Sequence, residues 1–245
     1  MSICAVRPAP VLNTPDFLFA FGGKTGTEIP LNERGLPFCF EFVALPGTLF
    51  QVLKYIDPHI AEVLCPSYSS KPLYVDTRFT KPGTTALIPQ MPSHELILHR
   101  MELRMGAPYV WGGNWGSGIP ELMNYYPPKG NLDLKTQQLW TLQGVDCSGL
   151  LYEASRGTTP RNTSQLIYFG KPLINNDLCP LDMIVYPGHV LFVLDSDTVI
   201  ESRYPRGVIC SDLKTRMEEL LQTRTQVFEW KPDLDPTKHF VIRRL

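Results

Sequence analysis

The sequence predicts an α+β protein with two domains, a β-rich domain at residues 1–92 and a mixed domain at residues 93–245. The chain has 245 residues, which is long enough for two modest domains that each bury a core. Its first third is rich in Pro and Gly and carries short β-like runs. After the prolines at 82, 89 and 92, helical patterns come first and strand patterns follow. We therefore place the domain boundary near residue 92.

Four short runs predict the strands of the first domain. Their β-branched and aromatic residues cover 38–44, 48–53, 73–79 and 84–88. Short strands at turn-rich intervals are typical of a small barrel.

The second domain opens with a helix. Ser93 can cap it, apolar positions follow helical spacing over residues 95–105, and Gly106 ends it. A second helix is expected to begin at Cys147. Strands at 182–186, 189–194 and 198–201, a helix near 212–221 and a strand at 239–244 complete the domain.

Composition excludes several classes of function. A net charge of −1 with interspersed acidic and basic residues supplies no positive field for nucleic acid or an acidic membrane. The six cysteines are scattered, without metal-ligand spacing, and favour reduced thiols in a cytosol. We see no export signal and no apolar run of the ~18 residues that a membrane span needs. The oligomeric state is left open.

Three residues in chain order have the parts of a thiol hydrolase. Cys147 follows Asp146 at a predicted helix start, where the helix dipole favours a thiolate. His189 opens a β-branched run, and Glu201 ends the next one. Singly, each residue also fits a structural role: a buried thiol, a core histidine or a strand-end ion pair.

Four ordered segments stand out in the second domain: GAPYVWGG at 106–113, DCSGL at 146–150, PRNTSQ at 160–165, and PLD at 180–182 before His189 and Val190. With these segments the domain resembles the NlpC-type cell-wall cysteine peptidases, over residues 93 to about 210. The β-rich first domain is similar, on the run at 73–79 and its strand pattern, to the bacterial SH3-like domains that often precede this catalytic domain. The resemblance implies an SH3-like barrel before a papain-like α+β catalytic domain.

The resemblance also implies roles for individual residues. Cys147 would be the nucleophile, His189 the base and Glu201 the third member, a position where the family more often has His, Asn or Gln. Tyr109 would contact the oxyanion or the substrate. The expected substrate contacts are Asp146 for a free amine, Ser148, Arg161 and Thr163 for a D-glutamyl carboxylate, Trp111 in the first segment, and Arg203 as a second carboxylate contact.

Two further features depart from the family pattern. Leu181 stands where the family usually has Gly, which we expect to alter the turn that leads to His189. Residues 114–145 form a long insertion between the tyrosine and cysteine segments. It is either a surface excursion or a wall of the cleft.

The expected activity is hydrolysis of the γ-D-glutamyl–diamino acid bond of peptidoglycan stem peptides or their fragments. A thioester acyl-enzyme on Cys147 needs no metal or organic cofactor. Two alternatives stay open: a thiol acyltransferase on the same fold, and a non-catalytic protein that binds peptidoglycan peptides.

Overall fold

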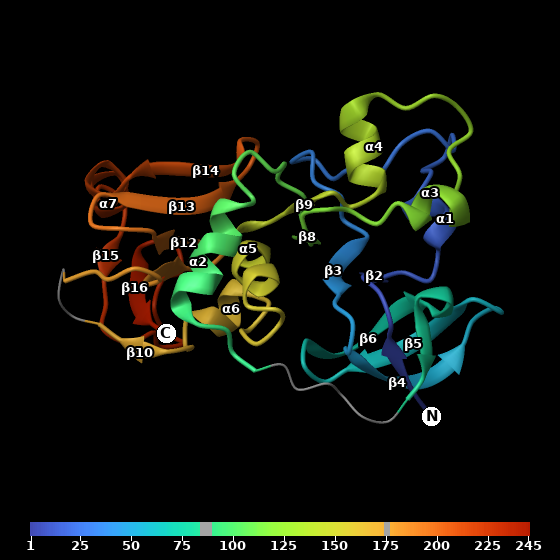
Figure 1. Cartoon of the computed structure of the whole chain (residues 1–245), viewed down its shortest axis with the longest axis horizontal. Helices are drawn as coiled ribbons and strands as arrows, with labels where there is room; N and C mark the ends of the chain where they lie inside the picture. Colours follow the sequence, from blue (N-terminus) through green and yellow to red (C-terminus); the bar gives the residue numbers. More distant parts are fainter. Residues whose placement is uncertain (84–89, 174–176) are drawn as a thin grey trace. The chain divides into compact units, whose positions relative to one another are not determined.

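The computed structural model describes residues 1–83, 90–173 and 177–245, and the chain forms two compact units of mixed α/β structure (Figure 1). The first unit comprises Met1–Pro89 and Val110–Val145. The second comprises Gln90–Tyr109 and Asp146–Leu245. The insertion at 114–145, which the sequence analysis kept with the second domain, thus belongs to the first unit. The strand expected at 84–88 lies outside the described residues.

A seven-stranded antiparallel sheet forms the first unit, in the order β3-β2-β6-β5-β4-β1-β7. The runs expected at 38–44 and 48–53 are confirmed as β3 and β4. The run expected at 73–79 is split between β6 and the 3₁₀ turn η1. The strands and this turn are β1 (Ser2–Ala5), β2 (Ala9–Leu12), β3 (Phe40–Ala44), β4 (Leu49–Tyr55), β5 (Ile60–Cys65), β6 (Ser69–Asp76), η1 (Thr77–Phe79) and β7 (Thr80–Pro82).

This sheet is open in the residues that the structure describes, because its edge strands β3 and β7 do not pair with each other. The strand order alone therefore does not establish the expected SH3-like barrel. Short helices and a two-stranded ribbon complete the unit: α1 (Phe17–Ala20), β8 (Asn114–Trp115), α3 (Glu121–Tyr125), α4 (Leu134–Trp140) and β9 (Gly144–Val145).

The insertion contributes to the core of the first unit. Trp140 is fully buried and donates its indole N–H to the carbonyl of Tyr126 at 2.8 Å. The Tyr126 ring stacks on Phe21, with centroids 5.1 Å apart. The Asn114 side chain bonds the N–H and C=O of Val43 at 2.9 and 2.8 Å, which ties β8 to β3. The insertion is therefore a packed element of this unit and not a surface excursion.

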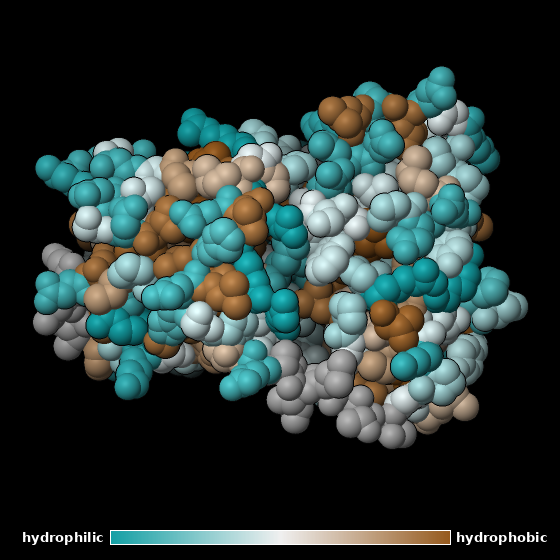
Figure 2. All heavy atoms as spheres, viewed as in Figure 1, coloured by the Kyte–Doolittle hydropathy of each residue, from teal (hydrophilic) through white to brown (hydrophobic). Residues whose placement is uncertain are grey.

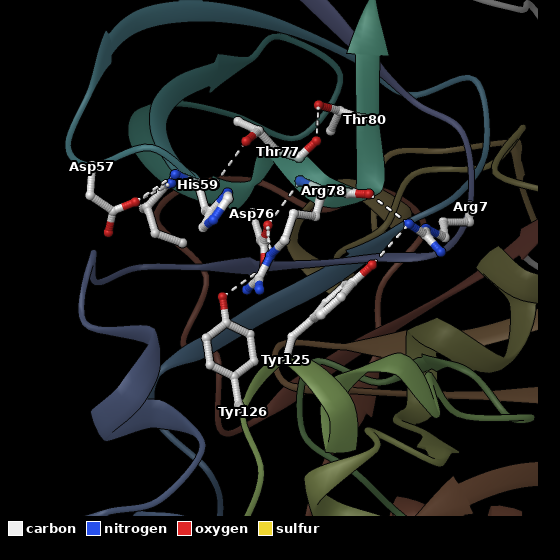
Figure 3. Close-up of polar contacts among 10 residues, drawn as sticks. Arg7, Asp57, His59, Asp76, Thr77, Arg78, Thr80, Tyr125 and Tyr126 are labelled. Atoms are coloured by element: carbon white, nitrogen blue, oxygen red, sulfur yellow. Dashed lines mark hydrogen bonds and ion pairs between the residues drawn. The ribbon is translucent and has the colours of Figure 1, made fainter.

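A buried carboxylate joins the insertion to the sheet (Figure 3). Asp76 is fully buried, accepts Nε and Nη2 of Arg78, and accepts the Tyr126 hydroxyl at 2.7 Å. The guanidinium of Arg78 lies 4.0 Å from the centre of the Tyr125 ring, a cation–π contact. The network satisfies a buried charge, and its partners come from sequence segments about fifty residues apart.

The second unit contains a six-stranded sheet in the order β10-β16-β11-β12-β13-β14, with β15 paired to β16. The strands expected at 182–186, 189–194, 198–201 and 239–244 are confirmed as β11, β12, β13 and β16, while β14 was not expected. The strands are β10 (Lys171–Pro172), β11 (Met183–Tyr186), β12 (His189–Val193), β13 (Thr198–Arg203), β14 (Gly207–Asp212), β15 (Thr225–Gln226) and β16 (His239–Arg244).

Helices of the second unit pack on one another and on this sheet. Helix α5 packs against α2 and against strands β12 and β13, and α7 packs against β13 and β14. An ion pair between Arg104 and Glu153, with Nη2 2.6 Å from Oε1, ties the chain after α2 to α5. The helices are α2 (His94–Glu102), α5 (Cys147–Ala154), α6 (Thr163–Leu166) and α7 (Leu213–Leu221), which confirms the expected cap at Ser93 and the expected helix near 212–221.

The visible face of each unit mixes hydrophilic and hydrophobic residues (Figure 2). Within the described parts of the chain, no helix has the length and apolar character needed to cross a bilayer.

Candidate active site

Cys147 is the first residue of α5, as the sequence predicts. Asp146 is the N-cap, and its carboxylate accepts the N–H of Gly149 at 2.7 Å. A side chain in this first turn lies near the positive end of the helix dipole and near N–H groups that have no partner within the helix, a position that stabilises negative charge. The small residues Ser148 and Gly149 follow it in the first turn.

An ion pair fixes this helix start. Arg161 is buried, and its Nη1 and Nη2 lie 3.0 and 2.6 Å from the two carboxylate oxygens of Asp146. The same Nη1 donates to the hydroxyl of Ser148 at 2.9 Å. Three of the expected substrate-binding residues therefore bind one another in this structure. A role for them toward a substrate amine or carboxylate stays a prediction.

His189 and Glu201 meet across neighbouring strands. The antiparallel pairing of β12 and β13 sets Phe192 opposite Ile200, and extending it places Glu201 diagonal to His189 on the same face of the sheet. The imidazole Nε2 lies 2.6 Å from Oε2 of Glu201, whose side chain is fully buried. Because Nε2 is engaged, Nδ1 is the ring nitrogen left to exchange a proton with a sulfur.

The pKa values of this pair follow from its surroundings. Burial lowers the pKa of His189, but interactions with the Cys147 side chain and with Glu201 outweigh it and raise the pKa to about 9. Burial raises the pKa of Glu201, but hydrogen bonds from His189 and Arg216 outweigh it and lower the pKa. The arrangement favours an imidazolium beside a carboxylate.

The turn before His189 brings it next to the cysteine. The Sγ atom of Cys147 lies 3.9 Å from the carbonyl oxygen of Gly188. The N–H of Gly188 is 3.3 Å from the hydroxyl of Thr163, at the start of α6. Thr163, expected to contact substrate, thus also holds the turn that carries the imidazole.

Tyr109 is positioned by the strand β14. The carbonyl of Ala107 accepts the N–H of Val208 at 2.9 Å, and a Cβ on Gly207 would lie 2.1 Å from the same oxygen, so only glycine fits there. Burial, then the charges of Asp146 and Cys147, raise the pKa of Tyr109. The phenol therefore stays protonated and can donate a hydrogen bond near the sulfur.

Two residues expected to contact substrate make no described interaction with the side chains of Cys147, His189 and Glu201. Trp111 belongs to the first unit and is 45% exposed. Arg203 is exposed at the end of β13, two residues beyond Glu201. Their roles toward a substrate stay predictions.

Leu181 adopts a φ of +73°, in the left-handed region that glycine favours. It is buried, and its N–H bonds the carbonyl of Val193 at 2.8 Å. The turn before β11 thus uses a conformation suited to glycine, at a cost of about 1–2 kcal/mol for leucine.

The sequence patterns did not predict that two further residues lie near His189. Arg216 of α7 binds both oxygens of Glu201, and the Tyr186 ring lies 5.5 Å from the imidazole, centre to centre. Arg216 had a detectable signal: it follows Leu213 by three residues and precedes Leu220 by four, so it shares their buried helix face. An arginine on a buried face requires an acidic partner.

Across residues 1–83, 90–173 and 177–245, His, Cys, Asp and Glu form no group of three or more that could hold a metal ion. The site is instead a set of thiol, imidazole, carboxylate and phenol groups.

Comparisons give distant structural neighbours. No family model matches the chain, and no curated protein matches it. An NlpC/P60 family protein from Bacillus cereus is 16% identical with a TM-score of 0.39, over 99% of this chain and 62% of its own. The peptidoglycan hydrolase RipB from Mycobacterium tuberculosis is 21% identical with a TM-score of 0.39, over 62% of this chain and 63% of its own.

A third neighbour is RipD from Mycobacterium tuberculosis, described as a non-catalytic NlpC/p60 domain protein adapted to peptidoglycan binding. It is 19% identical with a TM-score of 0.39, over 62% of this chain and 96% of its own. The chain spans less than two thirds of the length of the first two neighbours. At this level of similarity the neighbours assign no activity to this chain.

Proposed function

We propose that the protein is a cysteine hydrolase, with Cys147 as nucleophile, His189 as general base and acid, and Glu201 as the residue that orients the imidazole. The observation that carries the proposal is the 2.6 Å bond from His189 to the buried Glu201, on a turn that contacts the Cys147 sulfur. Nucleophilic catalysis by a thiol needs a base beside the sulfur and a third group that orients the base, and these two contacts support that assignment.

The proposed reaction is cleavage of an amide through a thioester. The Cys147 sulfur attacks the carbonyl carbon, and His189 gives its proton to the amine that leaves. His189 then takes a proton from water, the resulting hydroxide attacks the thioester, and the sulfur is released. Tyr109, held protonated, and the first-turn N–H groups of α5 can stabilise the oxyanion.

The proposed substrate is a peptidoglycan stem peptide, cut between γ-D-glutamate and the diamino acid. Support comes from the residue types that match the NlpC-type pattern: Asp146 for an amine, and Ser148, Arg161 and Thr163 for a carboxylate. Because Asp146 and Arg161 already bind each other, a substrate with both an amine and a carboxylate would have to share or replace that pairing. Trp111 and Arg203 are proposed as further contacts.

The first unit is proposed to be an SH3-like domain, supported by its sheet of short strands. Six free cysteines support a reducing compartment such as the cytosol. The two alternative functions are a thiol acyltransferase and a non-catalytic protein that binds peptidoglycan peptides.

One assay separates these functions. The protein is incubated with L-Ala-γ-D-Glu-diaminopimelate, and products are identified by mass spectrometry, with Cys147→Ala as the matched control. Release of diaminopimelate by the wild type alone supports the peptidase. Transfer of the acyl group to an added amine in preference to water supports the transferase. Binding without turnover in both proteins supports the silent module and contradicts the proposal.

A further inference from the structure

Glu201 is held from two sides. Its Oε2 accepts Nε2 of His189 at 2.6 Å, and α7 supplies the opposite contact through Arg216. The guanidinium Nε lies 2.7 Å from Oε1, and Nη2 lies 3.1 Å from Oε2. A two-point bond of this kind fixes the plane of a carboxylate as well as its position.

Arg216 is itself held in place. Its helix α7 is capped by Asp212, which accepts the N–H of Thr215 at 2.7 Å. Its Nη1 pairs with Glu219 at 2.5 Å, one helical turn away. Leu220, on the same helix, packs in the core under the sheet. These contacts hold the guanidinium of Arg216 in a fixed position on α7.

A fully buried carboxylate would, without a permanent cation, be pushed toward its neutral form. A protonated Glu201 would donate to Nε2 and turn the imidazole into the tautomer with its proton on Nδ1. That tautomer cannot accept a proton from the cysteine. An arginine cannot lose its charge in this pH range, so it keeps the carboxylate ionised as the pH falls.

We propose that Arg216 is a positioning residue of the active site, which keeps Glu201 ionised and in plane so that His189 presents Nδ1 to Cys147. The inference rests on the proposed function, and it assigns Arg216 no contact with substrate. The titratable or charged groups around this pair are Cys147 from α5, Tyr186 from β11, Arg216 and Glu219 from α7, and Arg224 after α7, which stacks on Tyr186.

The test measures two pH profiles of the full-length protein. One is kcat/KM for the peptide, and the other is the rate of Cys147 alkylation by iodoacetamide, which needs no substrate. In Arg216→Gln the acid limb of both profiles should move to higher pH by about one unit, the lower end of what an opposite charge does to a carboxyl group. Arg216→Lys keeps the charge and should keep the limb, with a lower kcat because lysine makes no two-point bond. Lys214→Gln removes a positive charge from an exposed position of the same helix; it is the matched control and should leave the limb in place.

A double substitution guards against a variant that does not fold. Glu201→Gln with Arg216→Met removes both charges, a change that buried pairs tolerate, and its acid limb should equal that of Glu201→Gln alone. The proposal is overturned if Arg216→Gln is folded and active with an unshifted limb. It is also overturned if Arg216→Met reduces activity tenfold or more on the Glu201→Gln background. A wild type that neither hydrolyses the peptide nor alkylates at Cys147 would instead refute the proposed function.

Discussion

Substitution of Asp146 should strongly weaken the start of α5. In Asp146→Ala the helix loses its cap, which costs about 1 kcal/mol. The same change leaves the guanidinium of Arg161, 2% exposed, without its carboxylate, and such loss of a buried partner costs about 3–5 kcal/mol. Asp146→Asn keeps an acceptor for the N–H of Gly149 and removes only the charge. We therefore expect Asn to be less damaging than Ala by about 1 kcal/mol.

The chain has two units, so a local readout is better suited than global unfolding. Hydrogen exchange of residues 147–154, followed by mass spectrometry, reports the opening free energy of α5. The double variant Asp146→Asn with Arg161→Met removes both charges and should recover most of the loss. If Asp146→Ala lowers the opening free energy of α5 by less than about 1 kcal/mol, the role given to this ion pair is refuted.

Three more outcomes are expected. The raised pKa of His189 stabilises the folded state fully below pH ~6.5, and this effect is lost as the pH rises through about 9. The stability of wild type minus that of His189→Gln, measured from the urea dependence of hydrogen exchange in β12, should therefore fall over that window; a flat difference would contradict it. Tyr109→Phe should lower kcat for the peptide about 10²-fold, as loss of an oxyanion donor does, with an unchanged far-ultraviolet spectrum, and an unaltered kcat would exclude that role. Trp140→Ala should cost about 3–5 kcal/mol, measured as lost protection of the segment around Tyr126, and normal protection there would contradict the core role of the insertion.

The helix that carries Cys147 and the strand that carries His189 could be predicted because the sequence patterns that specify them are local. An N-cap aspartate before small residues predicts the start of α5, and a β-branched run after Gly188 predicts β12. The chain order of Cys147, His189 and Glu201 predicted a group, and the register of β12 and β13 places two of its members, His189 and Glu201, on one face of the sheet. The contact from Arg216 could also have been predicted, because the sequence places this arginine on the buried face of a helix.

Other features depend on contacts that no local pattern reveals. Strand β2 contains Pro10, which argues against an interior strand, yet it pairs with β3 and β6 on its two sides. The insertion joins the first unit through Tyr126, which stacks on Phe21, more than a hundred positions earlier. Arg161 was expected to bind the carboxylate of a ligand, but in the structure it binds the carboxylate of Asp146, the N-cap of α5.

In the proposed reaction the Cys147 sulfur forms a covalent bond with the acyl part of its substrate. Acid-quenched mixtures of protein and L-Ala-γ-D-Glu-diaminopimelate, digested and analysed by mass spectrometry, measure this directly. We expect an L-Ala-D-Glu acyl adduct on the peptide that contains Cys147, and no adduct in Cys147→Ala. Release of diaminopimelate by Cys147→Ala at the wild-type rate would contradict it.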